Sequence, residues 1–245
     1  MNLNYTDIDD ITIGIYRDGP VGIGISGGAD SAVLLYILMS NVKHTVHIYN
    51  MSSVARVPVF GKNVDAVVKC CSELTGNTNY VVHKTILEHD ESMEYYFNML
   101  TEALDKQEVD VMYMGVTSFP PREVYLPFKG QQPEWHNDFR NGDVIKPLFG
   151  LTVPVHKADD FGESCPLSID GNPIDSLSLD TRVYVPLFNH NKKDIAKLYR
   201  HFNLEKTLLP VTRSCENDQH LESHCGNCWW CHERRWAFGN LGELQ

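Results

Sequence analysis

The sequence lacks an apolar run long enough to span a membrane, and its first ten residues hold neither basic residues nor the apolar stretch of a secretory signal. Positive charge is also in short supply, with 21 lysines and arginines against 32 aspartates and glutamates and a net charge of −11. A general nucleic-acid binder would need a basic surface. We therefore expect a cytoplasmic protein that acts on a small molecule, with no membrane association and no general nucleic-acid binding.

Cysteine is scarce, with seven residues in a chain of 245. The odd number and the CxxCxxC spacing at 225–231 indicate metal or redox chemistry rather than a disulfide framework. Two further cysteines lie in a predicted helix, where Cys71 is expected in the core and Cys70 has no assigned role. Cys165 is isolated in the sequence, and no role is assigned to it either.

Strands and helices are predicted to alternate in the first half of the chain. The strands are predicted at 19–25, 44–51, 79–86 and 109–117, and the helices between them at 30–39, 61–76 and 93–106. This alternation predicts an α/β fold with a doubly wound, Rossmann-like parallel sheet.

The alternating pattern breaks after residue 117. We predict a core at 1–117, an irregular insert at 118–182, and a segment at 183–245 that completes the core and binds a metal. The insert is rich in proline, glycine and aromatic residues, and we expect short hairpins or a lid over the substrate there. Its candidate contacts with an acceptor are Arg122, Glu123, Trp135, His136, Asp138 and Arg140.

A glycine-rich stretch, GISGGADSA at 24–32, joins the first predicted strand of this sheet to its helix. It is not a Walker A loop, because no lysine follows Gly28, and it does not fit a dinucleotide loop, because Gly22 and Gly24 lie inside the strand. What remains is Ser-Gly-Gly-x-Asp-Ser. Its glycines let backbone amides approach a phosphate, the helix directs its positive end there, and Ser26 and Ser31 add hydroxyls.

This loop resembles the pyrophosphate loop (PP-loop) of the N-type ATP pyrophosphatases, which have an adenine nucleotide alpha hydrolase-like fold. The resemblance implies that the loop holds the β- and γ-phosphates of ATP, so the α-phosphorus stays open to attack and AMP and pyrophosphate are released. It also implies that adenine lies against the end of the second strand, at Tyr49, Asn50 and Met51. A lysine in PLFNHNKKDI, Lys192, would hold phosphate.

The resemblance implies ten ATP-binding residues: Ser26, Gly27, Gly28, Ala29, Asp30, Ser31, Asn50, Met51, Gly115 and Lys192. The catalytic candidates among them are Ser26, Asp30, Ser31 and Lys192. Asp30 is expected to orient the loop or a Mg²⁺ ion, and a simpler alternative is that it caps the helix.

The C-terminal segment SCENDQHLESHCGNCWWCHERRWAF, at 214–238, contains four cysteines: Cys215, Cys225, Cys228 and Cys231. We expect them to bind one Zn²⁺ ion in a closed structural site. An iron–sulfur or redox role is the alternative. Three histidines remain candidates to replace one thiol: His220, His224 and His232. The tryptophans of this segment are expected to pack around the metal: Trp229, Trp230 and Trp236.

A PP-loop followed by this cysteine pattern resembles the family of 7-cyano-7-deazaguanine synthases of the QueC/ExsB type. The matching pieces are SGGADS, PLFNHNKKDI and the C-terminal segment with Arg234 or Arg235 and Phe238. The resemblance implies that ATP, with Mg²⁺, adenylates the carboxylate of 7-carboxy-7-deazaguanine. Ammonia then displaces AMP, and a further activation dehydrates the amide to the nitrile. It also implies a homodimer.

The chain departs from that family where the base would be recognised. The stretch Val-Pro-x-Arg-Asn is absent before the fourth strand, and the segment after Thr117 differs. A different PP-loop enzyme, an amidotransferase or sulfur transferase with another small molecule or nucleobase as acceptor, is therefore the alternative. A sulfur transferase would need a cysteine near the loop, and Cys70 and Cys71 are the candidates. A nucleotide-binding protein without catalysis is the third alternative, which AMP formation would exclude.

Overall fold

The computed structural model describes eleven parts of the chain: residues 3–8, 10–53, 62–87, 93–117, 120, 124, 168–169, 172–173, 182–187, 190–215 and 223–242. Several predictions fall outside the described residues. They concern Arg122, Glu123, Trp135, His136, Asp138, Arg140, Cys165 and His220.

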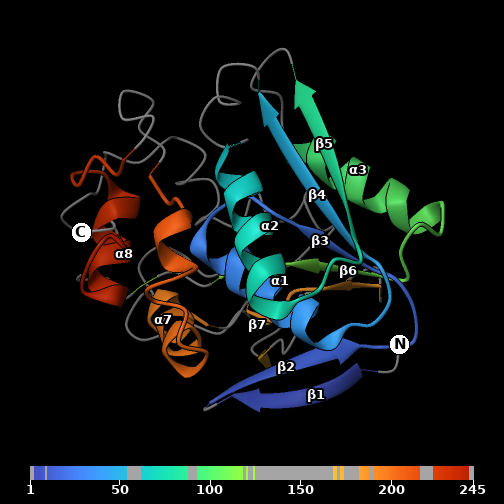
Figure 1. Ribbon diagram of the computed structural model, residues 1–245, viewed down its shortest axis with the longest axis horizontal. Coiled ribbons are helices and arrows are strands. Elements are labelled where there is room, and N and C mark those ends of the chain that lie inside the picture. The colour runs from blue at the N-terminus through green and yellow to red at the C-terminus, as the bar shows by residue number, and fades with distance from the viewer. Residues whose placement is uncertain are drawn as a thin grey trace.

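A parallel sheet of five strands forms the centre of the molecule (Figure 1). Its order is β5 (Tyr80–Leu87), β4 (Val46–Ser53), β3 (Val21–Gly24), β6 (Val111–Met114) and β9 (Val183–Tyr184). The chain enters at β3, moves outward through β4 to β5, and then crosses back to β6 and β9. The strand order thus reverses beside β3, which is where open α/β sheets bind their ligands. The predicted doubly wound sheet is confirmed.

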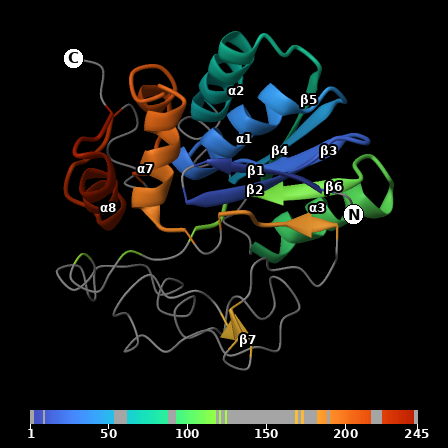
Figure 2. The same ribbon diagram turned by 90° about the horizontal axis from the view of Figure 1, so that it is seen from below.

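Helices cover both faces of this sheet. Figure 2 shows α1 (Ala29–Asn41) and α2 (Lys62–Thr75) on one face and α3 (Met93–Asp105) on the other. The α1 helix is apolar almost all round and is largely buried, since it also packs against α2 and α7 (Lys192–His201). Two buried clusters result, a large one on the α1 face and a smaller one on the α3 face.

Three elements were not predicted from the sequence. The N-terminal strands β1 (Leu3–Ile8) and β2 (Ile11–Tyr16) form an antiparallel hairpin, and α8 (Trp229–Phe238) begins inside the cysteine segment. A two-residue pair, β7 (Ser168–Ile169) and β8 (Asn172–Pro173), is one of the short hairpins expected in the insert. The hairpin β1–β2 is joined to the sheet by the Tyr113 hydroxyl, which accepts from the Tyr16 amide and donates to the Gly14 carbonyl.

The predicted boundaries hold to within a few residues, with one exception of consequence. The strand predicted at 109–117 ends at Met114, so Gly115 lies just beyond β6. A Cβ on Gly115 would lie 2.8 Å from the backbone nitrogen of Ser31. The end of β6 therefore touches the first turn of α1, directly below the glycine-rich loop.

Candidate functional site

The glycine-rich loop leaves the end of β3 and enters α1 through two glycines. Gly27 has a φ of +80°, which an L side chain rarely adopts, and Gly28 is the N-cap of α1 without any side-chain capping bond. The interpretation of Asp30 as a cap is therefore wrong, because Asp30 lies within the first turn. The first amides of the helix keep their donors for an anion.

Two serine hydroxyls hold the loop in shape through long hydrogen bonds. The Ser31 Oγ accepts from the Ser26 amide at 3.3 Å and lies 3.4 Å from the Ser26 Oγ. The Ser26 Oγ in turn accepts from the Gly28 amide at 3.3 Å. Hydrogen bonds of this length are weak, so the loop loses little stability when phosphate oxygens replace them.

Three residues from other parts of the chain hold the loop backbone in place. The Asn50 amide donates to the Ile25 carbonyl at 3.0 Å, and the Arg213 backbone amide donates to the Gly27 carbonyl at 2.9 Å. The Tyr199 hydroxyl donates to the Ala29 carbonyl at 3.0 Å. A loop carbonyl accepts each of these bonds, so none of them occupies a loop amide. A phosphate site needs those amides as donors.

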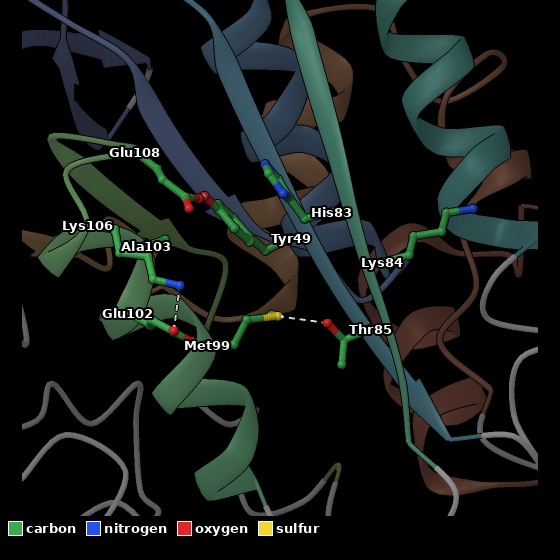
Figure 3. Close-up of a pocket in the computed structure, with 9 residues that line it drawn as sticks. All are labelled: Tyr49, His83, Lys84, Thr85, Met99, Glu102, Ala103, Lys106 and Glu108. Carbon is green, nitrogen blue, oxygen red and sulfur yellow. Dashed lines mark hydrogen bonds and ion pairs between the residues drawn. The ribbon is translucent and has the colours of Figure 1, made fainter.

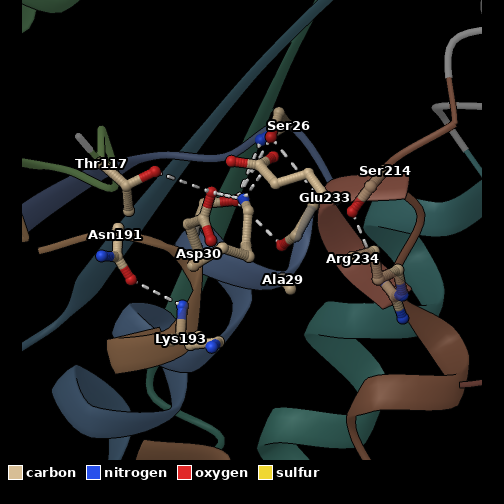
Figure 4. A network of polar contacts seen from close by, with 12 residues as sticks. Ser26, Ala29, Asp30, Thr117, Asn191, Lys193, Ser214, Glu233 and Arg234 are labelled. Atoms are coloured by element: carbon tan, nitrogen blue, oxygen red, sulfur yellow. Dashed lines mark hydrogen bonds and ion pairs between the residues drawn. The ribbon is translucent and has the colours of Figure 1, made fainter. Parts of the chain in front are cut away.

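Lys192, the first residue of α7, contacts the loop at Asp30. Figure 4 shows Asp30 and Glu233, the two carboxylates near its ammonium. A capping box fixes that start, because the Asn191 side chain accepts from the Lys193 amide while Asp194 accepts from the Asn191 amide. The ammonium of Lys192 is buried, donates to Asp30 and lies 4.0 Å from the Glu233 carboxylate. Burial by itself lowers the pKa of Lys192, but the two carboxylates outweigh it and the net shift is upward, so the side chain stays charged.

A second buried cation lies near Lys192 and its two carboxylates. Arg234 is fully buried, and it donates to the Ser214 hydroxyl at 3.1 Å and to the Leu209 carbonyl at 2.7 Å. It follows Glu233 directly in α8, so one helix supplies both a carboxylate to Lys192 and a cation beside it. A third buried cation, Arg213, donates from its Nε to the Cys215 carbonyl. Lys192 contacts the loop directly, and its charge favours an anionic ligand there.

Two buried polar atoms near the loop have no hydrogen-bond partner within the described parts of the chain: Asp30 Oδ1 and Asn63 Nδ2. Asn63 belongs to the first turn of α2, and its Cβ lies 3.3 Å from where a Cβ of Gly27 would stand. Buried polar groups in native proteins are normally paired. An amide donor and a carboxylate oxygen are therefore both left over beside the loop, which fits a site that a phosphate and its cation complete.

The remaining residues expected around ATP divide between two faces of the sheet. Asn50 is buried on the loop side, and Thr117 donates to Asp30 at 3.5 Å. Tyr49 points to the opposite face, where its hydroxyl donates to Glu108 at 3.2 Å. The side chain of Tyr49 is thus outside the site, whereas Met51 is half-buried just past Asn50. Asn63, Arg213 and Glu233 were missed by the sequence analysis because no local pattern marks them.

The four cysteines Cys215, Cys225, Cys228 and Cys231 come together at the start of α8. Their sulfur atoms all lie within 4.8 Å of one another, with Cys215 to Cys228 at 3.8 Å and Cys225 to Cys231 at 3.9 Å. Four thiolates on one tetrahedral ion at about 2.3 Å have sulfurs about 3.8 Å apart. The arrangement therefore fits a single metal ion.

The surroundings of these sulfurs also fit a cation. Backbone amides of Cys225 and Cys228 donate to the sulfurs of Cys215 and Cys225. Hydrogen bonds between the thiols and burial raise the pKa of Cys231 to about 12, so a cation is needed to hold it as a thiolate at neutral pH. Of the histidines considered as ligands, His224 accepts from the Ser214 amide instead, and burial lowers its pKa to about 4.

Comparison with known proteins finds a likeness over the C-terminal part. The family model described as queuosine biosynthesis protein QueC matches residues 174–242, which include Lys192 and all four cysteines but not the glycine-rich loop. No curated protein matches the chain significantly. Among 16 matching chains of solved structures is the U34-tRNA thiolase NcsA from Methanococcus maripaludis with its 4Fe-4S cluster. It is 17% identical with a TM-score of 0.45, over 94% of this chain and 74% of that chain, and carries no further conclusion.

The loop motif, the parallel sheet and the QueC match together support a PP-loop ATP pyrophosphatase-like protein. Among the helices of the described residues, none combines the length and the apolarity that crossing a bilayer requires.

Proposed function

We propose that this chain is an ATP-dependent ligase that adenylates the carboxylate of 7-carboxy-7-deazaguanine and converts it with ammonia to 7-cyano-7-deazaguanine. The observation that carries the proposal is the contact between Lys192 and Asp30, which brings a QueC-like segment onto a Ser-Gly-Gly-x-Asp-Ser loop. ATP is the co-substrate, and a homodimer working in the cytoplasm is part of the proposal.

In this proposal the loop holds the β- and γ-phosphates of ATP. The backbone amides of Gly28 and the first turn of α1 donate to the phosphate oxygens, and Ser26 and Ser31 exchange their mutual contact for bonds to them. Lys192 contributes a fixed positive charge, and the unpartnered amide of Asn63 donates from the other side. Mg²⁺ would neutralise phosphate charge beside Asp30, whose Oδ1 has no hydrogen-bond partner in the described parts of the chain.

Held in this way, ATP exposes its α-phosphorus to the acceptor. A carboxylate oxygen attacks that phosphorus, and pyrophosphate leaves with the bonding electron pair. Ammonia then attacks the carbonyl carbon, loses a proton and expels AMP, which gives the amide. A second ATP adenylates the amide oxygen, and loss of AMP with the two amide protons gives the nitrile. The charge of Lys192 and the amides at the start of α1 stabilise the charge that builds on the leaving pyrophosphate.

Zn²⁺ is the ion we propose for the four cysteines. A 4Fe-4S cluster would place each thiolate on a different iron, and the sulfurs would then stand further apart than the 3.8 Å and 3.9 Å separations here. A closed set of four thiolates leaves no position for substrate, so the role is structural. The ion would hold the start of α8, and with it Glu233 and Arg234, against the loop.

A sulfur transferase is less well supported. Cys71 is fully buried, its sulfur donates to the Ala32 carbonyl, and burial raises the pKa of its thiol far above neutral. Cys70 is half-buried and donates to the Thr207 carbonyl. Neither side chain is a nucleophile at neutral pH.

The proposal is tested with purified protein, ATP, Mg²⁺, ammonium and 7-carboxy-7-deazaguanine. AMP is separated from ADP by chromatography, and the amide and nitrile are followed by mass spectrometry. We expect AMP formation that depends on the base, with the amide appearing before the nitrile. ADP instead of AMP would overturn the adenylation chemistry. AMP formation that does not depend on this base would support the adenylation chemistry but indicate that another molecule is the acceptor.

A further inference from the structure

A second group of metal-ligating side chains lies on the α3 face of the sheet, away from both the loop and the four cysteines. His47, His83 and Glu108 place one nitrogen or oxygen atom each within 4.8 Å of the others. The rings of both histidines are half-buried, and Glu108 is exposed. Nothing in the proposed adenylation uses these residues.

The parallel pairing of β4 with the edge strand β5 brings the two histidines together. Tyr49 pairs with His83 and His47 with Val81, so His47, Tyr49 and His83 all project to the same face. The His47 Nδ1 lies 3.0 Å from the His83 Nε2, with the ring centres 5.2 Å apart and the planes within 13°. The two imidazoles therefore present these nitrogens to each other at hydrogen-bond distance.

The turn that ends α3 supplies the third group. The Glu108 amide donates to the Ala103 carbonyl and the Gln107 amide to the Leu104 carbonyl, while Gln107 takes a positive φ of 57°. This is a Schellman-type helix end, which fixes the backbone at Glu108. The Tyr49 hydroxyl then donates to the Glu108 carboxylate, and the Tyr49 ring stacks on His83 at 4.4 Å and 7° (Figure 3).

The group opens onto a pocket of about 280 Å³ that Tyr49, His83 and Glu108 line together with Lys106 and Thr85. Figure 3 shows Glu108, Tyr49 and His83 turned toward one another on the same side of the sheet. Waters can complete a coordination shell from this side. The Tyr49–Glu108 and Tyr49–His83 contacts also supply the outer support that oriented metal ligands normally have.

We propose that His47, His83 and Glu108 bind one divalent cation of the zinc class, in a site separate from the four cysteines. Two imidazoles and one carboxylate are the donors that Zn²⁺, Co²⁺ and Ni²⁺ prefer, whereas Mg²⁺ and Ca²⁺ take oxygen ligands. Two nitrogens on one tetrahedral ion at about 2.0–2.1 Å lie about 3.3 Å apart, so the two rings separate by a few tenths of an ångström and turn toward the ion.

Such an ion would join three parts of the sheet. It would tie the edge strand β5 to β4 and both of them to the turn between α3 and β6. Binding should therefore stabilise this half of the sheet, and the pocket would supply exchangeable water ligands. The site does not depend on the proposed adenylation, because it lies on the other face and shares no residue with the loop.

The test uses Co²⁺ as the probe on the full chain, with its cysteine site first filled with Zn²⁺. Cobalt on nitrogen and oxygen ligands gives weak visible bands, whereas cobalt on thiolates adds intense sulfur-to-cobalt charge transfer in the near ultraviolet. We expect one further equivalent of cobalt without the charge-transfer band. His83→Gln and Glu108→Gln should each weaken its binding at least about tenfold. His44→Gln is the matched control, because His44 is exposed and outside the group.

Two outcomes would overturn the proposal. One is that the chain binds no cobalt beyond the cysteine site. The other is that Glu108→Gln and His83→Gln bind the second equivalent of cobalt as tightly as the wild type does. Glu108→Gln keeps a side-chain oxygen that accepts from the Tyr49 hydroxyl, and Glu108 is exposed, so this variant should fold. Its result therefore tests the proposal even if His83→Gln fails to fold. Melting with and without added Zn²⁺ gives a second readout: the wild type and His44→Gln should gain thermal stability, and Glu108→Gln should not.

Discussion

Replacement of Gly115 by alanine should disturb the loop more than it disturbs the fold. A Cβ at this position would stand 2.8 Å from both the nitrogen and the Cα of Ser31, and 3.2 Å from the carbonyl carbon of Asp30. All three atoms belong to the backbone in the first turn of α1, so no side-chain rotation relieves the contact. The end of β6 and the start of α1 must separate by several tenths of an ångström to restore ordinary contact.

The expected cost follows from comparable overpacking in cores, at about 1–3 kcal/mol. For a chain of this size that corresponds to a fall in melting temperature of about 2–12 °C. The same movement shifts Ser31 relative to Ser26, whose amide and hydroxyl both contact the Ser31 Oγ. We therefore expect ATP·Mg²⁺ affinity, measured by calorimetry, to fall at least about tenfold below what the folded fraction explains.

Gly22→Ala is the matched control for this prediction. Gly22 is also in the central sheet, and its Cβ would stand even closer to a neighbour, 2.6 Å from the terminal methyl of Met112. That atom is the end of a flexible side chain, so it can move away at little cost. Gly22→Ala should bind ATP·Mg²⁺ nearly as well as the wild type. If Gly115→Ala matches Gly22→Ala in both melting temperature and affinity, the close approach of β6 to α1 does not position the loop.

Four further outcomes are expected. Lys192→Met should lower the free energy of unfolding in urea by about 3–5 kcal/mol, because it removes the cation beside the Asp30 and Glu233 carboxylates. Adding Glu233→Gln should recover part of that stability but not ATP binding, and an unchanged midpoint for the single variant would contradict this. Asn63→Leu should hold or raise stability by removing an unpartnered buried amide, yet weaken ATP binding; equal affinity would refute the role of that amide. Cys228→Ser should lower the zinc content per chain measured by atomic emission, whereas His224→Ala should not, and the reverse result would make His224 a ligand. A hydrogen bond from His190 lowers the pKa of Asp194 from 3.8 to about 2. The ionised Asp194 therefore contributes on the order of 2 kcal/mol to the free energy of unfolding above pH 3.8, and this contribution is lost toward pH 2. An acid-unfolding profile of Asp194→Asn identical to that of the wild type would contradict this.

The strands and helices of the core were predictable because their signals are local. Apolar periodicity placed β3, β4 and β5 and the helices between them within a few residues. The hairpin β1–β2 was missed although Ile11, Ile13 and Ile15 alternate clearly, since so short a run carries little weight without a partner strand. The α8 helix was missed for another reason. Its buried face includes Glu233 and Arg234, which look like solvent-facing residues in the sequence.

In the candidate site, too, the residues set by local sequence were predictable and the long-range contacts were not. Local chemistry identified the loop of Ser26 to Ser31 and the four cysteines, because a tight turn and a metal site both need particular residues at short spacing. The contacts of Asp30 were not predictable, since its main partner is Lys192, 162 residues later. The expectation that Tyr49 faces the nucleotide failed because strand alternation turns it to the opposite face.

The sequence by itself thus determined the order of the core strands and helices from β3 to β6, the phosphate-type loop and the four-thiol set, all of which arise from neighbours along the chain. Only the tertiary structure decided which buried charges meet. It joined Lys192 to Asp30 and Glu233, and it set His47 beside His83 through the register of two parallel strands. It also left the side-chain amide of Asn63 without a hydrogen-bond partner among the described residues. The physical reason is that local conformational preference acts over a few residues, whereas the burial of charge and the choice of partner depend on packing across the whole chain.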